Sequence, residues 1–301
     1  MNVLTNFKKG VKLVSRELIE KTFNNSDNYK VVLTNANNNN AIVFFSSHAI
    51  YGNDGDDEYF KTRILVNNRF EWENVSNNKL IQRKYKLLIF VRDLKKETYR
   101  FGINSELNSY DKIIDKIAEL TKGYNLTTCG NSAGGYMAQL CGIKLNAERI
   151  FTFSGYFKLP YGEYPILKPY ISGNIPMFYF VPYYSEGDII QYNESKECKG
   201  VYTYLFDSKE HGVTVKGECY PLLLTFSNEK LIDIYNKNKD KIIDKNSFYR
   251  SITPAKLKLL NLLGYIFSIK NEECDRGKRK ILCIFGIKLK ITLKNLVKKE
   301  N

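Results

Sequence analysis

Short apolar runs recur along this chain, and the segments between them carry apolar residues at helical spacing. Short runs rich in β-branched and aromatic residues predict buried strands. Such runs occupy residues 41–45, 86–93, 124–129, 149–153, 176–182 and 201–206. Ile113, Ile114, Ile117 and Leu120 recur at helical spacing and predict an amphipathic helix over residues 110–122. Strands that alternate with helices indicate an α/β fold, with a mostly parallel central sheet flanked by helices.

Both ends of this alternating region predict further elements. Residues 28–34 and 41–45 are expected to form an antiparallel pair across the polar tract at 37–40. Residues 219–236 are expected to form one helix after the last strand. We therefore divide the chain into an N-terminal helical lead-in at 1–27, an α/β domain at 28–245 and a basic, apolar C-terminal appendage at 246–301.

A serine lies between glycines at one of the predicted strand-to-helix junctions. Gly130, Ser132 and Gly134 form a G-x-S-x-G pattern that follows the strand at 124–129 and precedes an apolar helix expected at 133–145. Glycine tolerates a turn this tight, and the turn leaves the serine hydroxyl exposed at the edge of the sheet. The pattern alone is common in turns, but in this context it predicts a nucleophile elbow with Ser132 as the nucleophile.

The chain contains two histidines, so the candidates for a catalytic base are few. Only His211 follows Ser132, and it lies just after the strand predicted at 201–206. Asp188, in the loop expected after the preceding strand, is the favoured acid, with Glu186 as the alternative. A carboxylate there would accept the Nδ1–H of His211 and turn its Nε2 toward Ser132. The order serine, acid, histidine then predicts a catalytic triad.

Acyl transfer also needs two backbone N–H donors for the oxyanion. The residue after the nucleophile supplies one, so Ala133 is the first candidate. The second is expected in the loop after the strand at 41–45, where Ser47 lies. His48 follows, either as a substrate contact or as a hydrogen-bonded loop histidine, and its position does not separate these roles. The acidic segment at 53–58 lacks the spacing of a calcium loop, so we expect no metal.

Length and composition agree with a globular protein. The chain of 301 residues is 43% hydrophobic and 14% aromatic, which suits one large α/β domain with appendages and excludes general disorder. No apolar run is long enough to span a membrane, and residues 1–9 lack the apolar core of a signal peptide. We therefore expect the protein in the cytoplasm, where it could lie at the inner face of the membrane.

The net charge of +14 is concentrated near the C-terminus. Residues 251–301 contain 12 Lys and Arg against 4 Asp and Glu, and basic and apolar residues alternate over 280–294. We expect no nucleic-acid partner, because no nucleic-acid-binding motif accompanies the charge. Two interpretations remain: a solvated appendage, or contact with an anionic membrane surface, with the lysines toward the headgroups. We rank the membrane surface first.

Residues 30–223 resemble the α/β-hydrolase superfamily. The resemblance is carried by Gly-Asn-Ser-Ala-Gly-Gly at 130–135, by Asp188 and by His211 with Gly212. Within the superfamily, this elbow, the long helix before it and the compact interval from acid to histidine resemble serine-dependent O-acetyltransferases of bacterial capsule and surface-polysaccharide loci. The chain departs from lipases and esterases, because Ser-Ser-His-Ala at 46–49 stands where those proteins have a His-Gly-Gly-Gly motif.

This resemblance implies acyl transfer through an acyl-enzyme on Ser132, with acetyl-CoA as the donor and a glycan as the acceptor. A carboxylesterase or deacetylase of the same fold is the first alternative, because the two reactions differ only in what receives the acyl group. A non-catalytic accessory protein of a surface-glycan assembly system is the second. The segments 263–271 and 280–290 are similar to a C-terminal tail of bacterial glycosyltransferases, which again implies glycan assembly.

Overall fold

The computed structural model describes residues 13–52, 55–159, 165–212, 219–253, 267–274, 277–284 and 287–292. The chain divides into two compact units, Met1–Lys245 and Asn246–Asn301. The first unit contains the serine, the acid and the histidine singled out above. The second contains the basic appendage.

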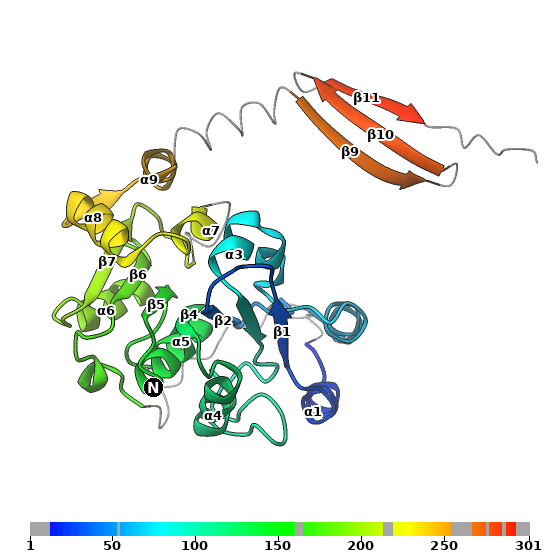
Figure 1. Ribbon diagram of the computed structural model, residues 1–301. Helices are drawn as coiled ribbons and strands as arrows, with labels where there is room; N and C mark the ends of the chain where they lie inside the picture. The colour runs from blue at the N-terminus through cyan, green and yellow to red at the C-terminus, as the bar shows by residue number, and fades with distance from the viewer. Residues whose placement is uncertain are drawn as a thin grey trace, which may run out of the picture. The chain divides into compact units, whose positions relative to one another are not determined.

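The first unit is built on an eight-stranded sheet in the order β1-β3-β2-β4-β5-β6-β7-β8 (Figure 1). The strands are β1 (Tyr29–Leu33), β2 (Asn40–Phe45), β3 (Leu87–Val91), β4 (Asn125–Asn131), β5 (Arg149–Phe153), β6 (Met177–Pro182), β7 (Val201–Phe206) and β8 (Ile242–Ile243). Neighbouring strands are parallel, except that β1 is antiparallel to β3. The mostly parallel sheet predicted from the apolar runs is therefore confirmed.

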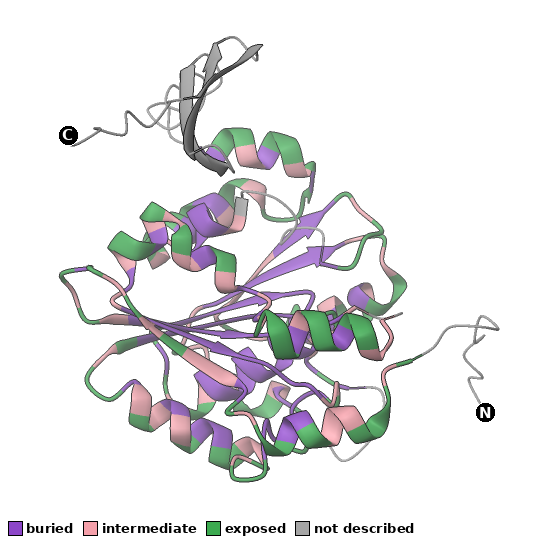
Figure 2. Ribbon diagram, turned by 90° about the vertical axis from the view of Figure 1, so that its right-hand side faces the viewer, coloured by how far each residue is buried: buried purple, intermediate pink, exposed green. Residues whose placement is uncertain are grey.

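Helices lie on both faces of this sheet (Figures 1 and 2). They are α1 (Arg16–Asn24), α2 (Asp57–Phe60), α3 (Lys79–Lys84), α4 (Tyr110–Leu120), α5 (Ala133–Lys144), α6 (Glu186–Ser195), α7 (Cys219–Leu223) and α8 (Asn228–Asn238), with a π-helix at Lys61–Val66 and 3₁₀ helices at Glu73–Asn77 and Lys168–Tyr170. Ser109 caps α4 by accepting the N–H of Lys112 at 3.3 Å. The amphipathic helix predicted over 110–122 is confirmed, because α4 buries Ile113, Ile114 and Ile117.

Burial on both faces explains why the central strands appear in the sequence as continuous apolar runs. A parallel sheet covered on both sides has no solvent face, so its strands need not alternate. Aromatic rings stack between neighbouring strands, as Phe44 does with Phe90 at 5.3 Å between ring centroids. Phe180 continues this packing, at 4.8 Å from Phe153 and 4.7 Å from Tyr204. The strand ends that carry the site residues therefore project from a densely packed centre.

The antiparallel pair expected between residues 28–34 and 41–45 is wrong. β1 is antiparallel, but its partner is β3, with Tyr29 opposite Val91. β2 lies between β3 and β4 and is parallel to both. The physical reason is burial. Residues 41–45 are fully buried and need a partner strand on each side, whereas β1 exposes Leu33 and can stand at the edge of the sheet.

The single helix expected at 219–236 is also wrong, because two helices occupy this region. α7 ends at Leu223, and α8 begins after Ser227. The Ser227 hydroxyl accepts the N–H of Lys230 at 3.3 Å. A serine in this position starts a new helix, because its oxygen satisfies an N–H that the first turn leaves unpaired.

The second unit contains a three-stranded antiparallel sheet in the order β11-β10-β9. Its strands are β9 (Phe267–Cys274), β10 (Gly277–Ile284) and β11 (Ile287–Thr292), and α9 (Lys245–Ile252) spans the division between the units. Residues 254–266, 275–276, 285–286 and 293–301 of the appendage lie outside the described residues. Within the described part of the chain, each helix is too short or too polar to cross a membrane. Contact of the appendage with a membrane surface stays a prediction.

Candidate active site

Ser132 lies at the junction of β4 and α5, in a backbone conformation that residues other than glycine rarely adopt. Its φ is 55° and its ψ is −119°. The Ser132 N–H donates to the carbonyl of Phe153 at 2.8 Å, and the Ser132 carbonyl accepts the N–H of Tyr136 at 3.1 Å. These bonds hold the turn in place from β5 and from the first turn of α5. Strain of this kind is typical of functional sites, where the surrounding structure maintains it.

The glycines around Ser132 are required by close backbone contacts. A Cβ atom on Gly130 would lie 2.1 Å from the carbonyl oxygen of Gly134. A Cβ atom on Gly134 would lie 2.2 Å from the carbonyl oxygen of Phe45 and 2.7 Å from that of Ser46. No side chain fits at these distances. The chain leaving β2 therefore packs directly against the first turn of α5, next to the candidate nucleophile.

His211 and Asp188 form a hydrogen-bonded pair. The His211 Nδ1 atom lies 2.8 Å from Oδ2 and 3.1 Å from Oδ1 of Asp188. The Asp188 side chain is 2% exposed and also accepts the hydroxyl of Ser185 at 2.6 Å, whereas the His211 side chain is 44% exposed. Of the two acids weighed above, Asp188 reaches the histidine, and Glu186 is exposed. We call Asp188, His211 and Ser185 the acid–base arm.

The sequence predicted Asp188 in a loop. In the structure it lies in the first turn of α6. The helix starts at Glu186, directly after Ser185, so the loop leaving β6 is shorter than the sequence indicated. The helix gives the acid a fixed place on a regular element. It also explains why Asp188 and Glu186 differ, because positions two apart on a helix do not face the same side.

A hydrogen bond and a close backbone approach hold the loop that carries His211 next to the elbow. The N–H of Gly212 donates to the Ser154 hydroxyl at 3.0 Å. Gly212 has a φ of +70°, and a Cβ atom there would lie 3.1 Å from Oδ1 of Asn131, the neighbour of Ser132. Within the described residues, no hydrogen bond joins Ser132 to His211. The structure therefore brings the serine and histidine loops together without closing their hydrogen bond, which is common before substrate binds.

The segment after β2 carries the residues predicted to complete the oxyanion site. The N–H of Ser46 is used by the sheet, since it donates to the carbonyl of Val91 at 3.0 Å. The N–H of Ser47 donates to the carboxylate of Glu71, and the Ser47 hydroxyl donates to the same carboxylate at 2.8 Å. Asp93 also belongs here, because its N–H donates to the Ser46 hydroxyl at 3.2 Å. We call Ser46, Ser47, Glu71 and Asp93 the oxyanion arm.

The two predicted oxyanion donors, Ala133 and Ser47, differ in whether their backbone N–H already has an acceptor. Ala133 is the first residue of α5, where a backbone N–H has no partner within the helix. The Ser47 N–H is already donated to Glu71. Sequence reasoning missed Glu71, because it lies 24 residues from Ser47 in no recognised motif. The alternation of aromatic and acidic residues over 70–73 was the only available signal of a partly buried segment.

Burial shifts the pKa values of ionisable groups in and beside the oxyanion arm. Burial raises the pKa of Asp93 to about 6 and raises the pKa of Glu71 above its ordinary value. Burial, with Lys96 nearby, lowers the pKa of His48 to about 4. His48 is therefore neutral at pH 7, and its Nε2 lies 3.4 Å from the Thr98 hydroxyl. This contact favours the hydrogen-bonded loop histidine over the substrate contact.

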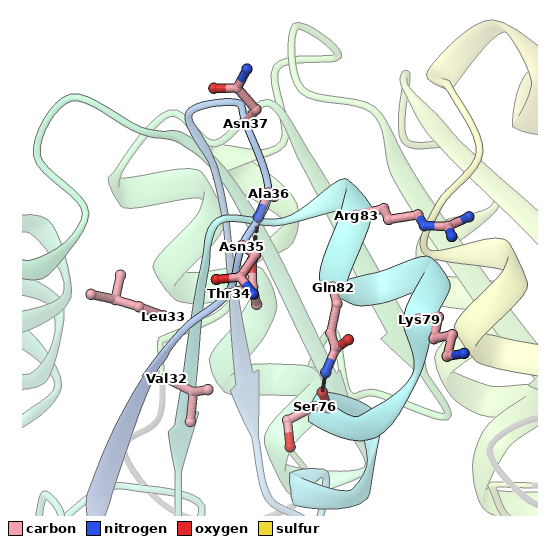
Figure 3. A pocket seen from close by; sticks show the side chains of 10 residues that line it. All are labelled: Val32, Leu33, Thr34, Asn35, Ala36, Asn37, Ser76, Lys79, Gln82 and Arg83. Carbon is pink, nitrogen blue, oxygen red and sulfur yellow. Dashed lines mark hydrogen bonds between the residues drawn. The ribbon is translucent and has the colours of Figure 1, made fainter.

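A hollow of about 490 Å³ lies elsewhere on the sheet (Figure 3). It is lined by Val32, Leu33, Thr34, Asn35, Ala36, Asn37, Ser76, Lys79, Gln82 and Arg83. Leu33 pairs with Leu87 at the start of β3, so the hollow lies at the amino-terminal ends of the parallel strands. Ser132 follows β4 and lies at their carboxyl ends. In Figure 3, Gln82 points toward Ser76, whereas Lys79 and Arg83 point away from β1. The hollow is separate from the candidate site, and its cations do not converge.

A mostly parallel sheet with a serine after β4, an acid after β6 and a histidine after β7 defines the α/β-hydrolase fold. The chain has this fold, as its resemblance implied.

No family model and no curated protein match the chain. Among solved structures it is similar to MenH from S. aureus, with 12% identity and a TM-score of 0.48 over 70% of this chain and 100% of that one. It is also similar to a hormone-sensitive lipase from a metagenome library, with 14% identity and a TM-score of 0.40 over 79% and 89% of the two chains. A third is the capsule O-acetyltransferase of Neisseria meningitidis serogroup A, with 15% identity and a TM-score of 0.42 over 60% and 83%. At these identities the likeness concerns the fold alone.

Proposed function

We propose that this protein is a serine acyltransferase that O-acetylates a bacterial capsular or surface polysaccharide. The observation that carries the serine chemistry is the contact between Nδ1 of His211 and the buried Asp188 carboxylate at 2.8 Å. A carboxylate in this position fixes the imidazole tautomer, so Nε2 is free to accept a proton. Ser132 lies at the adjacent junction of β4 and α5, in a strained turn of the kind that carries a nucleophile, and its surface is 8% exposed.

The proposed reaction has two halves. His211 accepts the Ser132 proton while the serine oxygen attacks the thioester carbonyl of acetyl-CoA, and the N–H of Ala133 donates to the oxyanion. The carbon–sulfur bond then breaks, and the CoA thiol leaves with the proton from His211. In the second half, a sugar hydroxyl gives its proton to His211 and attacks the acetyl-serine. The sugar ester forms, and Ser132 regains its proton.

The acceptor is inferred from the sequence resemblance rather than from the triad. Hydrolysis by the same residues would make the protein a carboxylesterase, because water can replace the sugar hydroxyl. We favour transfer, because a protein in the cytoplasm, at the inner face of the membrane, has acetyl-CoA and growing glycan chains within reach. The net charge of +14 suits both the CoA phosphates and an anionic polysaccharide.

Incubation with labelled acetyl-CoA and a panel of capsular polysaccharides tests this proposal. We expect label on the glycan, and we expect Ser132→Ala to abolish it. Ser105→Ala is the control, because Ser105 is an exposed turn residue outside the site. Label released only as acetate would favour the esterase. If Ser132→Ala changed neither glycan labelling nor hydrolysis of acetate esters, the enzymatic proposal would fail and the accessory protein would be favoured.

We propose further that the basic appendage binds an anionic membrane surface. Lys288 and Lys290 lie on β11, and we expect their replacement by Glu in the full chain to weaken binding to phosphatidylserine vesicles. Flotation with such vesicles measures this, with phosphatidylcholine vesicles as the control. Equal flotation of the natural chain and the variant would contradict membrane contact through the appendage.

A further inference from the structure

Glu71 occupies a donor that the proposed reaction needs. Its carboxylate accepts two hydrogen bonds from one residue, the backbone N–H and the side-chain hydroxyl of Ser47. A carboxylate oxygen resembles the oxyanion of a tetrahedral intermediate, since both are negatively charged oxygen acceptors. The Ser47 N–H therefore already makes the kind of bond that it would make to the reacting group.

The position of Ser47 makes it the natural second donor. The chain leaving β2 is packed on the first turn of α5, where Gly134 leaves no room for a side chain against Phe45. The N–H of Ser46 is used by the sheet. Ser47 thus supplies the first N–H after β2 that the sheet does not use.

We propose that Glu71 is a displaceable occupant of the oxyanion site, which holds the Ser47 N–H at rest and is replaced there by the acyl oxygen of the substrate. This inference rests on the proposed serine acyl transfer and adds a residue to that same site. Glu71 is then neither the nucleophile nor the base. Its carboxylate competes with the substrate for one hydrogen-bond donor.

The surroundings of Glu71 favour displacement over permanent structural pairing. Within the described residues, no cation forms an ion pair with its carboxylate. Burial disfavours the charged form and raises its pKa, and the two bonds from Ser47 stabilise the charge more than the nearby Arg69 does. A carboxylate held in this way can leave when another acceptor replaces it.

Only the side chain has to move. The next residue, Trp72, donates its indole N–H to the carbonyl of Phe45 at 3.0 Å and stacks on Phe44 at 5.6 Å between ring centroids. This anchor fixes the backbone beside Glu71 to the end of β2. In the proposed exchange, the backbone stays in place and the Glu71 side chain rotates to release the Ser47 N–H.

Binding of phenylboronic acid tests the proposal. The serine oxygen bonds to boron, the serine proton passes to His211, and the boron becomes tetrahedral and negatively charged. One boronate oxygen then needs the oxyanion donors. We expect Glu71→Gln and Glu71→Ala to bind phenylboronic acid about fivefold or more tightly than the natural chain, and to hydrolyse p-nitrophenyl acetate faster, since one oxyanion donor contributes about 10²–10³-fold to rate. Glu73→Gln is the matched control, because this carboxylate two residues along pairs with Lys30 instead.

Two variants are used because the alanine leaves a space and the glutamine does not. If both bind phenylboronic acid no more tightly than the natural chain, while unfolding at the same temperature, Glu71 is structural and the proposal is overturned. Ser132→Ala separates this result from failure of the proposed function. If binding does not depend on Ser132, the serine chemistry itself fails. If it depends on Ser132 but not on Glu71, only the displaceable carboxylate fails.

Discussion

The acid–base arm and the oxyanion arm use the same interaction with opposite consequences. In each arm a sparsely solvated carboxylate accepts two hydrogen bonds: Asp188 from His211 and Ser185, and Glu71 from the N–H and hydroxyl of Ser47. Asp188 binds the side of the histidine that does no chemistry and leaves Nε2 free. Glu71 binds the only N–H that Ser47 can offer. A buried carboxylate therefore prepares one arm and blocks the other.

The largest expected effect tests whether the acid–base arm is catalytic. We expect His211→Ala to lower kcat for p-nitrophenyl acetate hydrolysis by about 10⁴–10⁶-fold, because no general base then activates Ser132. His48→Ala is the natural control, as the second histidine of the chain. A comparable loss of kcat in His48→Ala would contradict a catalytic role that belongs to His211 in particular.

The second-largest expected effect tests whether Asp188 orients the His211 imidazole. Asp188→Asn keeps the shape of the side chain but can present an amide group to Nδ1, which favours the wrong imidazole tautomer. We expect kcat to fall by about 10³–10⁴-fold with little change in KM. Glu186→Gln should leave the rate within a few-fold, because Glu186 is exposed on the same helix. A loss below about tenfold for Asp188→Asn would show that the contact with His211 is structural.

Gly134→Ala tests the contact that packs the chain leaving β2, which carries the oxyanion arm, against the elbow at the start of α5. The added Cβ atom would lie 2.2 Å from the Phe45 carbonyl oxygen, so we expect the unfolding free energy to fall by about 3 kcal/mol or more. Gly187→Ala, where the added atom meets nothing within 4 Å, should instead stabilise α6 by about 0.5–1 kcal/mol. Denaturant unfolding measures both. Equal stability of the two variants would contradict the close approach of β2 to α5.

The oxyanion arm should also show a pH dependence of stability through Asp93. Its pKa is raised from 3.8 to about 6 in the folded chain, so its contribution is present below pH 4 and is lost as the pH rises through 6. The natural chain should therefore gain up to about 3 kcal/mol relative to Asp93→Asn between pH 7 and pH 4. His48→Gln should show the opposite sign, because a lowered pKa contributes stability above pH 6.5 that is lost toward pH 4. Urea unfolding at several pH values measures these differences, and a pH-independent difference for Asp93→Asn would contradict the shift.

The smallest effect separates the two bonds that hold Glu71. Ser47→Ala removes the hydroxyl, which donates to Glu71 at 2.8 Å, and keeps the backbone N–H. With one bond fewer to Glu71, we expect kcat/KM to rise about two- to threefold. Ser105→Ala should leave it unchanged. A fall in kcat/KM would mean that the hydroxyl itself assists the reaction.

The sequence predicted the contact between Asp188 and His211 but not the one between Ser47 and Glu71, although the two contacts span similar lengths of chain. His211 and Asp188 are separated by 23 residues, and Ser47 and Glu71 by 24. The first pair was found because the chain order of serine, acid and histidine is a known rule. No rule connects a loop serine with a glutamate in the next insertion, and only tertiary packing brings them together.

The same limit explains the errors in the fold. Apolar runs identified the central strands, because burial on both faces leaves a continuous pattern. The partner of β1 was assigned wrongly, because an apolar run indicates that a strand is buried but does not indicate which strand pairs with it. The start of α6 was missed, because Ser185 caps no N–H in the structure and Gly187 weakens the helical pattern at its first turn.

The exposure of His211 has a consequence for how acyl groups are divided between products. With 44% of this side chain open to solvent, water has access to the imidazole that the proposed reaction uses as its base. If the proposed acetyl-serine forms, its loss to hydrolysis would compete with transfer and would depend on how long the acceptor covers the imidazole. Under the proposed acetyl transfer, acetyl-CoA would be conserved only where acceptor chains are dense, so glycan supply would set the yield.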